Sequence, residues 1–197
     1  MESHVKIAGH PIHPVLIVLP LGLLGSAVIF DIIYLITGNG IFPTVAFYDI
    51  ALGILGGLVA ALFGFIDWLA VPGGTRAKTI GAWHGIGNAT IVVLFAISWL
   101  LRNADPGHVP STVAYICSFA GVLLALVTAW LGGEMVDRLG VGVYPGANLD
   151  APSSLSGMPA STRFAGAAGA AVAGRGSGDF EETREDQPGP DEPTGHE

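Results

Sequence analysis

The sequence predicts an all-α protein, a four-helix transmembrane bundle followed by a disordered C-terminal tail. Of its 197 residues, 51% are hydrophobic and only 12% are charged, whereas soluble domains average about 25% charged residues. The mean hydropathy of +0.60 agrees with a membrane protein. Four apolar stretches are each long enough to cross a bilayer, since a hydrocarbon core of about 30 Å needs roughly 20 helical residues.

We place the four spans at residues 14–37, 47–70, 82–101 and 112–131. Each stretch is almost continuously apolar, which favours helices, because the strands of a membrane barrel alternate apolar and polar residues over about ten positions. The short separators make neighbouring helices antiparallel. They contain Gly38-Asn39-Gly40 with Pro43, Pro72-Gly73-Gly74, and Asp105-Pro106-Gly107 with Pro110.

The distribution of basic residues predicts how the bundle is oriented. Positively charged segments next to membrane spans stay in the cytoplasm. Arg102 lies on one side of the predicted membrane, and four basic residues lie on the other: Lys6, Arg76, Lys78 and Arg138. We therefore expect a multi-pass protein of the cell inner membrane, the plasma membrane, with both termini in the cytoplasm.

The chain divides into a membrane domain, residues 1–147, and an acidic tail, residues 148–197. The tail holds nine of the 16 acidic residues and three of the eight basic ones. Because a Gly-, Ala-, Ser- and Pro-rich acidic segment buries too little apolar surface to offset chain entropy, we expect disorder there, and a tail dispensable for folding.

Composition also limits the partners. The lipid bilayer is the predicted partner, whereas the five basic residues of the membrane domain are too few for the phosphate contacts that give nucleic-acid affinity. The single cysteine, Cys117, excludes an intramolecular disulfide and a cysteine-rich zinc site. No sequence motif of a familiar enzyme class occurs in a suitable context.

Polar residues gather at the predicted inner ends of all four spans. Ionisable groups in or near a membrane are costly, so each is a candidate for function. His84 and Asn88 are four residues apart and share one helix face, and we expect His13 to cap the first helix with Pro14 as its first residue. The full set is His10, His13, Asp67, His84, Asn88 and Glu134.

Several kinds of chemistry fit this inner set. As a cofactor site it would use His10, His13, His84 and Asn88 around haem. As a transition-metal site it would use three imidazoles and two carboxylates, namely His10, His13, His84, Asp67 and Glu134. A proton relay, or a purely structural role in capping helices and crossing the bundle by hydrogen bonds, remains open as well.

The predicted outer side carries a smaller set of charges. Asp31, Asp49 and Arg102 lie within or at the ends of three spans. An ion pair of Arg102 with Asp31 or with Asp49 would make the carboxylates tolerable in the membrane. We interpret this set as structural.

Short motifs in order along the chain resemble the bacterial membrane-protein family catalogued as domain of unknown function 2231. The resemblance covers about residues 8–143 and implies a four-helix membrane domain without a settled activity. Some relatives are fused to Rieske or cytochrome c domains, which implies membrane redox work. The matching residues include Gly9-His10-Pro11-Ile12-His13-Pro14, Asp67-Trp68, Gly73-Gly74-Thr75-Arg76-Ala77, His84 with Asn88, and Gly132-Gly133-Glu134.

This chain departs from the family pattern at Val18, where many relatives have a histidine, and at Asp137 and Leu139, where they have Tyr and His. An intramembrane haem that used the first-helix histidine would lack that ligand here. The cluster at the inner face is then the remaining candidate.

Three classes of function follow. The first is a redox-associated membrane subunit that binds haem or a metal and works with separate membrane redox proteins. The second is a small transporter or proton-conducting bundle, with Asp31 and Asp67 as carriers. The third is a non-catalytic membrane scaffold.

Overall fold

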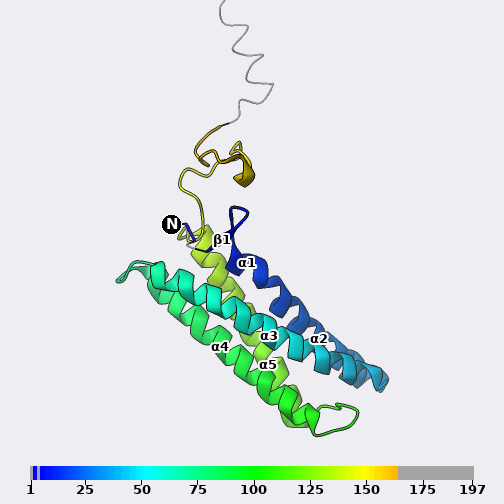
Figure 1. The fold of residues 1–197 in the computed structure, drawn as a ribbon. Helices are drawn as coiled ribbons and strands as arrows, with labels where there is room; N and C mark the ends of the chain where they lie inside the picture. The colour runs from blue at the N-terminus through cyan, green and yellow to red at the C-terminus, as the bar shows by residue number, and fades with distance from the viewer. Residues whose placement is uncertain (1, 4, 164–197) are drawn as a thin grey trace, which may run out of the picture.

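The computed structural model describes residues 2–3 and 5–163, and long helices dominate it (Figure 1). Four helices are long and apolar enough to cross a membrane, as the sequence predicts. The first of them consists of α1 and α2 end to end. The elements are β1 (Lys6–Ile7), β2 (His10–Pro11), α1 (Ile12–Leu16), α2 (Val18–Thr37), α3 (Ile41–Ala70), α4 (Arg76–Asn103), α5 (Thr112–Asp137) and the 3-10 helix η1 (Ser154–Ser156).

The helices extend beyond the predicted spans. Hydropathy identifies only the apolar part of a helix, whereas the helix itself continues through its polar ends. Helix α4 begins at Arg76 and α5 ends at Asp137. Pro43 does not separate two helices but lies in the first turn of α3. Backbone N–H groups of a first turn have no intrahelical partner, so proline removes no hydrogen bond there.

The first span begins earlier than the sequence predicts and is interrupted once. Helix α1 starts at Ile12, with Pro11 at its N-cap. His13 is therefore inside the first turn. Our expectation that it caps the helix is wrong. The helix is interrupted at Ile17. Pro20 follows three residues later and has no N–H to donate to the carbonyl of Leu16, so one helical hydrogen bond is missing at this point.

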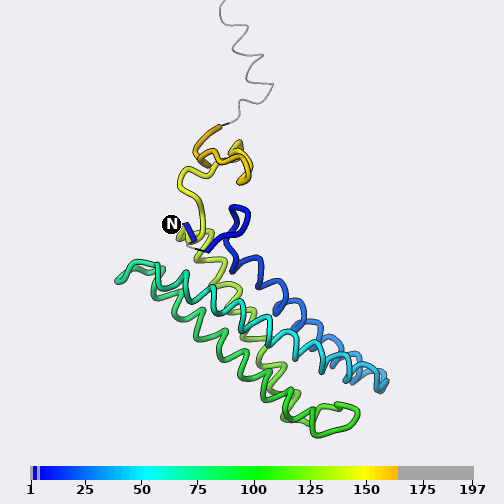
Figure 2. The backbone as a smooth tube through the Cα atoms, in the orientation of Figure 1, coloured from blue at the N-terminus to red at the C-terminus, as the bar shows by residue number. Residues whose placement is uncertain are grey.

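The four spans pack side by side, α2 against α3, α3 against α4, and α4 against α5 (Figures 1 and 2). Glycines allow the close approach: a Cβ at Gly53 would lie 2.6 Å from Leu24 Cδ2, and one at Gly121 would lie 2.7 Å from Phe95 Cε2. Close backbone contact of this kind is a main source of helix association in lipid. The buried core consists of Leu24, Ala27, Val28, Ala46, Ile50, Ile91 and Phe95.

The bundle has two ends, for which we use two names. The proximal end holds the start of α1, the end of α3, the start of α4 and the end of α5, and the N-terminal hairpin lies there (Figure 1). The distal end holds the α2–α3 and α4–α5 loops. The predicted inner set belongs to the proximal end and the predicted outer set to the distal end.

The N-terminal hairpin pairs β1 with β2 in antiparallel register, Lys6 opposite Pro11 and Ile7 opposite His10. Its two turn residues, Ala8 and Gly9, have φ of 49° and 79°. Positive φ at both positions is typical of the tight turn that matches the twist of a two-stranded ribbon.

The chain after α5 packs on this hairpin. The Tyr144 hydroxyl donates to the Gly9 carbonyl, and Ser154 Oγ donates to the Ala8 carbonyl over 3.2 Å. Lys6 lies over the Tyr144 ring and bonds Glu2, which raises the pKa of Lys6. Residues 148–163 of the predicted tail contain turns and η1, while residues 164–197 lie outside the described part of the chain.

Candidate functional site

Two of the predicted ligand residues face each other across the proximal end. His13 on α1 and His84 on α4 have ring centroids 6.5 Å apart and ring planes at 85°. Both side chains are half-buried. The histidines lie 71 positions apart in the chain, so the packing of the first span and α4 against α3 creates this pair.

Backbone carbonyls orient both rings. His13 Nδ1 lies 2.8 Å from the Ala60 carbonyl oxygen of α3, and His84 Nδ1 lies 2.9 Å from the Thr128 carbonyl oxygen of α5. Because a carbonyl only accepts, Nδ1 carries the hydrogen in both rings. In a neutral imidazole, Nε2 then keeps its lone pair and is the nitrogen available for a metal or a proton.

Glycines make room for the two imidazoles. A Cβ at Gly64 of α3 would lie 2.8 Å from His13 Cε1, and a Cβ at Gly132 of α5 would lie 3.2 Å from His84 Cε1. The imidazole of His13 therefore lies directly against the backbone of α3, and that of His84 against α5. Gly132 belongs to the Gly132-Gly133-Glu134 motif that carries the family resemblance.

Asn88 supports His84 indirectly. Its Nδ2 donates to the His84 carbonyl over 2.8 Å, and its Oδ1 accepts from Thr128 Oγ1 over 3.4 Å. Thr128 is also the residue whose carbonyl oxygen holds the His84 ring. Asn88 thus joins α4 to α5 beside the histidine, as a positioning residue.

The other three predicted ligands have different neighbours. His10 is exposed, with Nδ1 3.2 Å from the Ala8 carbonyl. Asp67 accepts from Ser3 Oγ over 2.7 Å, and Glu134 pairs with Arg76 over 2.7 Å. Within residues 2–3 and 5–163, no three His, Cys, Asp or Glu side chains form a group that could hold a metal ion. The structure therefore brings His13 and His84 together, but does not gather all five proposed metal ligands.

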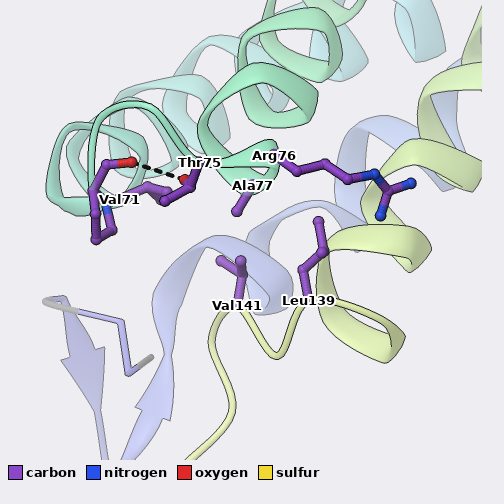
Figure 3. Close-up of a pocket in the computed structure, with 7 residues that line it drawn as sticks. Val71, Thr75, Arg76, Ala77, Leu139 and Val141 are labelled. Carbon is purple, nitrogen blue, oxygen red and sulfur yellow. Dashed lines mark hydrogen bonds between the residues drawn. The ribbon is translucent and has the colours of Figure 1, made fainter.

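A shallow pocket at the proximal end is separate from the histidine pair. It has a volume of about 290 Å³, and Figure 3 shows Leu139 and Val141, from the chain after α5, facing the start of α4. Thr75 Oγ1 donates to the Pro72 carbonyl over 2.8 Å at its rim. The lining is mainly apolar and contains none of the predicted ligands: Val71, Pro72, Thr75, Arg76, Ala77, Leu139 and Val141.

The distal end contains a buried ion pair. Arg102 donates from both terminal nitrogens to Asp31, over 2.7 and 2.5 Å, and both side chains are 0% exposed. The predicted pairing of Arg102 is confirmed, and the partner is Asp31. Asp49 instead accepts a hydrogen bond from Ser26 Oγ over 2.7 Å.

Two serines that were not among the predicted residues complete this buried network. Ser98 Oγ lies 3.2 Å from Arg102 Nε, and Ser118 Oγ lies 3.4 Å from Arg102 Nη2. The contact of Ser98 with Arg102 could have been predicted, because residues four apart lie on the same face of a helix. The sequence contains no signal for the contact of Ser118 with Arg102, because that contact depends on how α5 packs against α4.

Four lipid-length helices, an outward apolar surface and a fully buried ion pair define a multi-pass membrane protein. The chain belongs to the family described as predicted membrane protein (DUF2231), whose model matches residues 9–145. This match confirms the resemblance and covers all four spans. No curated protein and no solved structure matches the chain.

Proposed function

We propose that this protein is a redox-associated membrane subunit in which His13 and His84 bind one transition metal, either as an ion or as haem iron. The observation that carries the proposal is the pair itself: two imidazoles 6.5 Å apart, each with its Nδ1 held by a backbone carbonyl. This is the arrangement of metal-ligating histidines, whose second nitrogen is fixed by a hydrogen bond.

The ring separation suits a shared metal. Metal–imidazole bonds are about 2.0–2.1 Å long, and the ring centre lies about 1 Å beyond the nitrogen, so two imidazoles on opposite sides of one metal have centroids roughly 6 Å apart. The observed 6.5 Å is close to this value. His10, Asp67 and Glu134 are not needed for such a two-ligand site.

The packing favours a bare ion over haem. The imidazoles already lie against α3 at Gly64 and against α5 at Gly132, so a porphyrin plane would require the helices to separate, whereas an ion needs only the gap between the rings. Imidazole suits copper, iron, zinc and nickel, and copper or iron would supply one-electron chemistry when bound. The role of His13 and His84 is to hold the metal, and that of Ala60, Thr128 and Asn88 is to orient the rings.

Metal analysis and absorption spectroscopy on the full chain, purified in mild detergent, test this site. We expect one metal per chain or a Soret band, lost in His13→Ala and in His84→Ala while the helical circular dichroism persists. The matched control is His10→Ala, which changes the exposed histidine of the same motif and should keep the metal.

Absence of a bound metal or haem that depends on His84 would reject the site. If the wild-type protein contains neither metal nor haem, and titration with copper, ferrous iron and haemin gives no binding that depends on His84, the pair is structural. A Soret band in place of a metal ion would assign haem as the bound form.

The proposal includes the orientation of the protein in the plasma membrane, with both termini cytoplasmic. Its support is the basic count, Lys6, Arg76, Lys78 and Arg138 at the proximal end against Arg102 at the distal end; Arg102 is buried in its ion pair. The histidine pair would then lie on the cytoplasmic side, where a separate redox partner reaches it. Reporter fusions after Gly40, Gly74, Gly107 and Gly146 should alternate in compartment, and a periplasmic signal at Gly74 would overturn this orientation.

A further inference from the structure

The N-terminal hairpin is held at its tip by the chain that follows α5. We call residues 140–162 of this chain the strap. The Tyr144 hydroxyl donates to the Gly9 carbonyl, and Ser154 Oγ donates to the Ala8 carbonyl over 3.2 Å. A Cβ at Gly9 would lie 2.7 Å from Ser154 Cβ, so the strap lies directly against the hairpin turn (Figures 1 and 2).

The strap is folded back on itself. Asn148 Nδ2 donates to the Ala160 carbonyl over 2.8 Å, and a Cβ at Gly146 would lie 2.6 Å from Ser161 Cβ. These contacts join the two ends of the strap and leave Ser154 in the middle of the loop between them. The strap therefore presents a defined surface to the hairpin.

The hairpin is connected directly to the histidine pair. Strand β2 continues without a break into α1 at Ile12, whose N–H donates to the Val5 carbonyl of the hairpin over 3.1 Å. His13 is the next residue, four positions after Gly9, whose carbonyl the strap binds. A change in the position of the hairpin is thus transmitted to His13.

Helix α1, which carries His13, is the least buried helix of the bundle. It has five residues and none of them is buried, whereas α2 buries four residues and α3 buries six. One turn of helix is marginally stable without tertiary packing. On α3, the His13 ring contacts Ala60 and Gly64, so the position of α1 depends on this ring and on what holds the two ends of the helix.

The second end of α1 has the features of a hinge. The helix ends at Leu16, α2 begins at Val18, and Pro20 provides no N–H for the Leu16 carbonyl. Helices bend at such prolines. Because His13 lies about 6 Å from Ile17 along the axis, a rotation of α1 by about 10° moves it by about 1 Å. Metal–ligand distances vary by only about 0.2 Å.

We propose that the strap is a latch on the hinged helix α1 and thereby controls whether His13 stands opposite His84. This regulation rests on the proposed function of the two histidines as a metal site. With the strap on the hairpin, both imidazoles face one ion. When the strap is released, α1 turns about Ile17 and His13 leaves the pair, which opens the path by which the ion is loaded or lost.

Hydrogen-exchange mass spectrometry of the full chain in lipid nanodiscs, with a chelator present, tests the latch without any metal. The readouts are the amides at the two ends of α1, those of Ile12 and Ile17. The double variant Tyr144→Phe with Ser154→Ala removes both latch hydroxyls. We expect both amides to exchange roughly 5- to 100-fold faster in it, the effect of two ordinary hydrogen bonds on an opening equilibrium, while the core amides of α4 are unchanged.

The matched control removes the same atoms elsewhere, in Tyr48→Phe with Ser156→Ala. Tyr48 is an exposed residue of the distal end, and the Ser156 hydroxyl donates within the strap, to the Ser153 carbonyl. Exchange in α1 should equal that of the wild type. Equal exchange in the latch variant and in this control would overturn the latch, whether or not the protein binds a metal.

Transfer of Cu²⁺ from the protein to a chelator connects the latch to the histidine pair. We expect Cu²⁺ to dissociate faster from the latch variant than from the control, by about the same factor as the exchange, because both processes pass through the open form. Faster exchange with unchanged Cu²⁺ dissociation would overturn control of the pair by the strap. Failure of the wild type to bind Cu²⁺ through His84 would reject the metal site, and with it this regulation, while the exchange rates would still establish or exclude the hinge.

Discussion

Breaking the Arg102–Asp31 pair should destabilise the bundle strongly, because the pair is completely buried. Both side chains are 0% exposed, and the carboxylate accepts two hydrogen bonds from the guanidinium. Removing one member of such a pair leaves an uncompensated buried charge, which typically costs 3–5 kcal/mol. At about 1.4 kcal/mol per factor of ten, Asp31→Leu or Arg102→Met should change the folding equilibrium by roughly 10²- to 10⁴-fold.

The pair should also show strong coupling in a double-mutant cycle. Replacing both members with apolar residues, as in Asp31→Leu with Arg102→Met, leaves no buried charge and should recover much of the lost stability. The measurement is reversible unfolding in mixed micelles, followed by far-ultraviolet circular dichroism. The matched control is Arg76 with Glu134, an ion pair of 2.7 Å whose arginine side chain is 59% exposed; its coupling should stay within about 1 kcal/mol.

A free energy of unfolding within about 1 kcal/mol of the wild type for the single variants at Asp31 and Arg102 would contradict a strongly stabilising buried pair. A coupling energy equal to that of the Arg76–Glu134 pair would contradict it as well. Either result would show that water or rearranged side chains solvate the charges at the distal end.

Three further predictions concern packing and the tail. Gly64→Ala places a Cβ 2.8 Å from the His13 ring and should destabilise the protein by about 1–3 kcal/mol in thermal unfolding, whereas Gly85→Ala meets nothing within 4 Å and should be neutral or stabilising by up to about 1 kcal/mol. Gly121→Ala meets Phe95 at 2.7 Å in the core, so a melting temperature equal to that of the wild type would contradict the packing of α4 on α5. Deleting residues 164–197, an acidic segment rich in Gly and Ala, should leave membrane insertion and the melting temperature unchanged, and a clear decrease in either would show that this segment packs on the bundle.

The sequence alone predicted the number of spans because hydrophobic length is a local property. Each apolar stretch either reaches the thickness of a bilayer or does not, whatever its neighbours do. The helix ends were predicted less well. Hydropathy does not register a helix that continues into water, as α4 does from Arg76, and Pro43 is compatible with a first turn although it resembles a separator.

Residue types alone predicted that an ion pair exists at the distal end, but they did not predict which carboxylate takes part. A single arginine among membrane spans needs a carboxylate, so the existence of a pair followed from the sequence. Its partner did not, because Asp31 and Asp49 were equally acceptable by composition and approximate depth. The choice depends on how α2 and α3 are rotated against α4, which directs Asp31 to Arg102 and Asp49 to Ser26.

Contacts among the predicted inner set, at the proximal end, were even harder to predict from the sequence. The sequence placed six polar residues at one end of the bundle, but depth along a helix does not determine which side chains meet. His13 and His84 face each other because Gly64 lets one imidazole lie on α3 and Gly132 lets the other lie on α5, while Glu134 pairs with Arg76. Rotation and axial offset of packed helices are set by small residues at their contacts, so only the tertiary structure decides which of these polar groups meet.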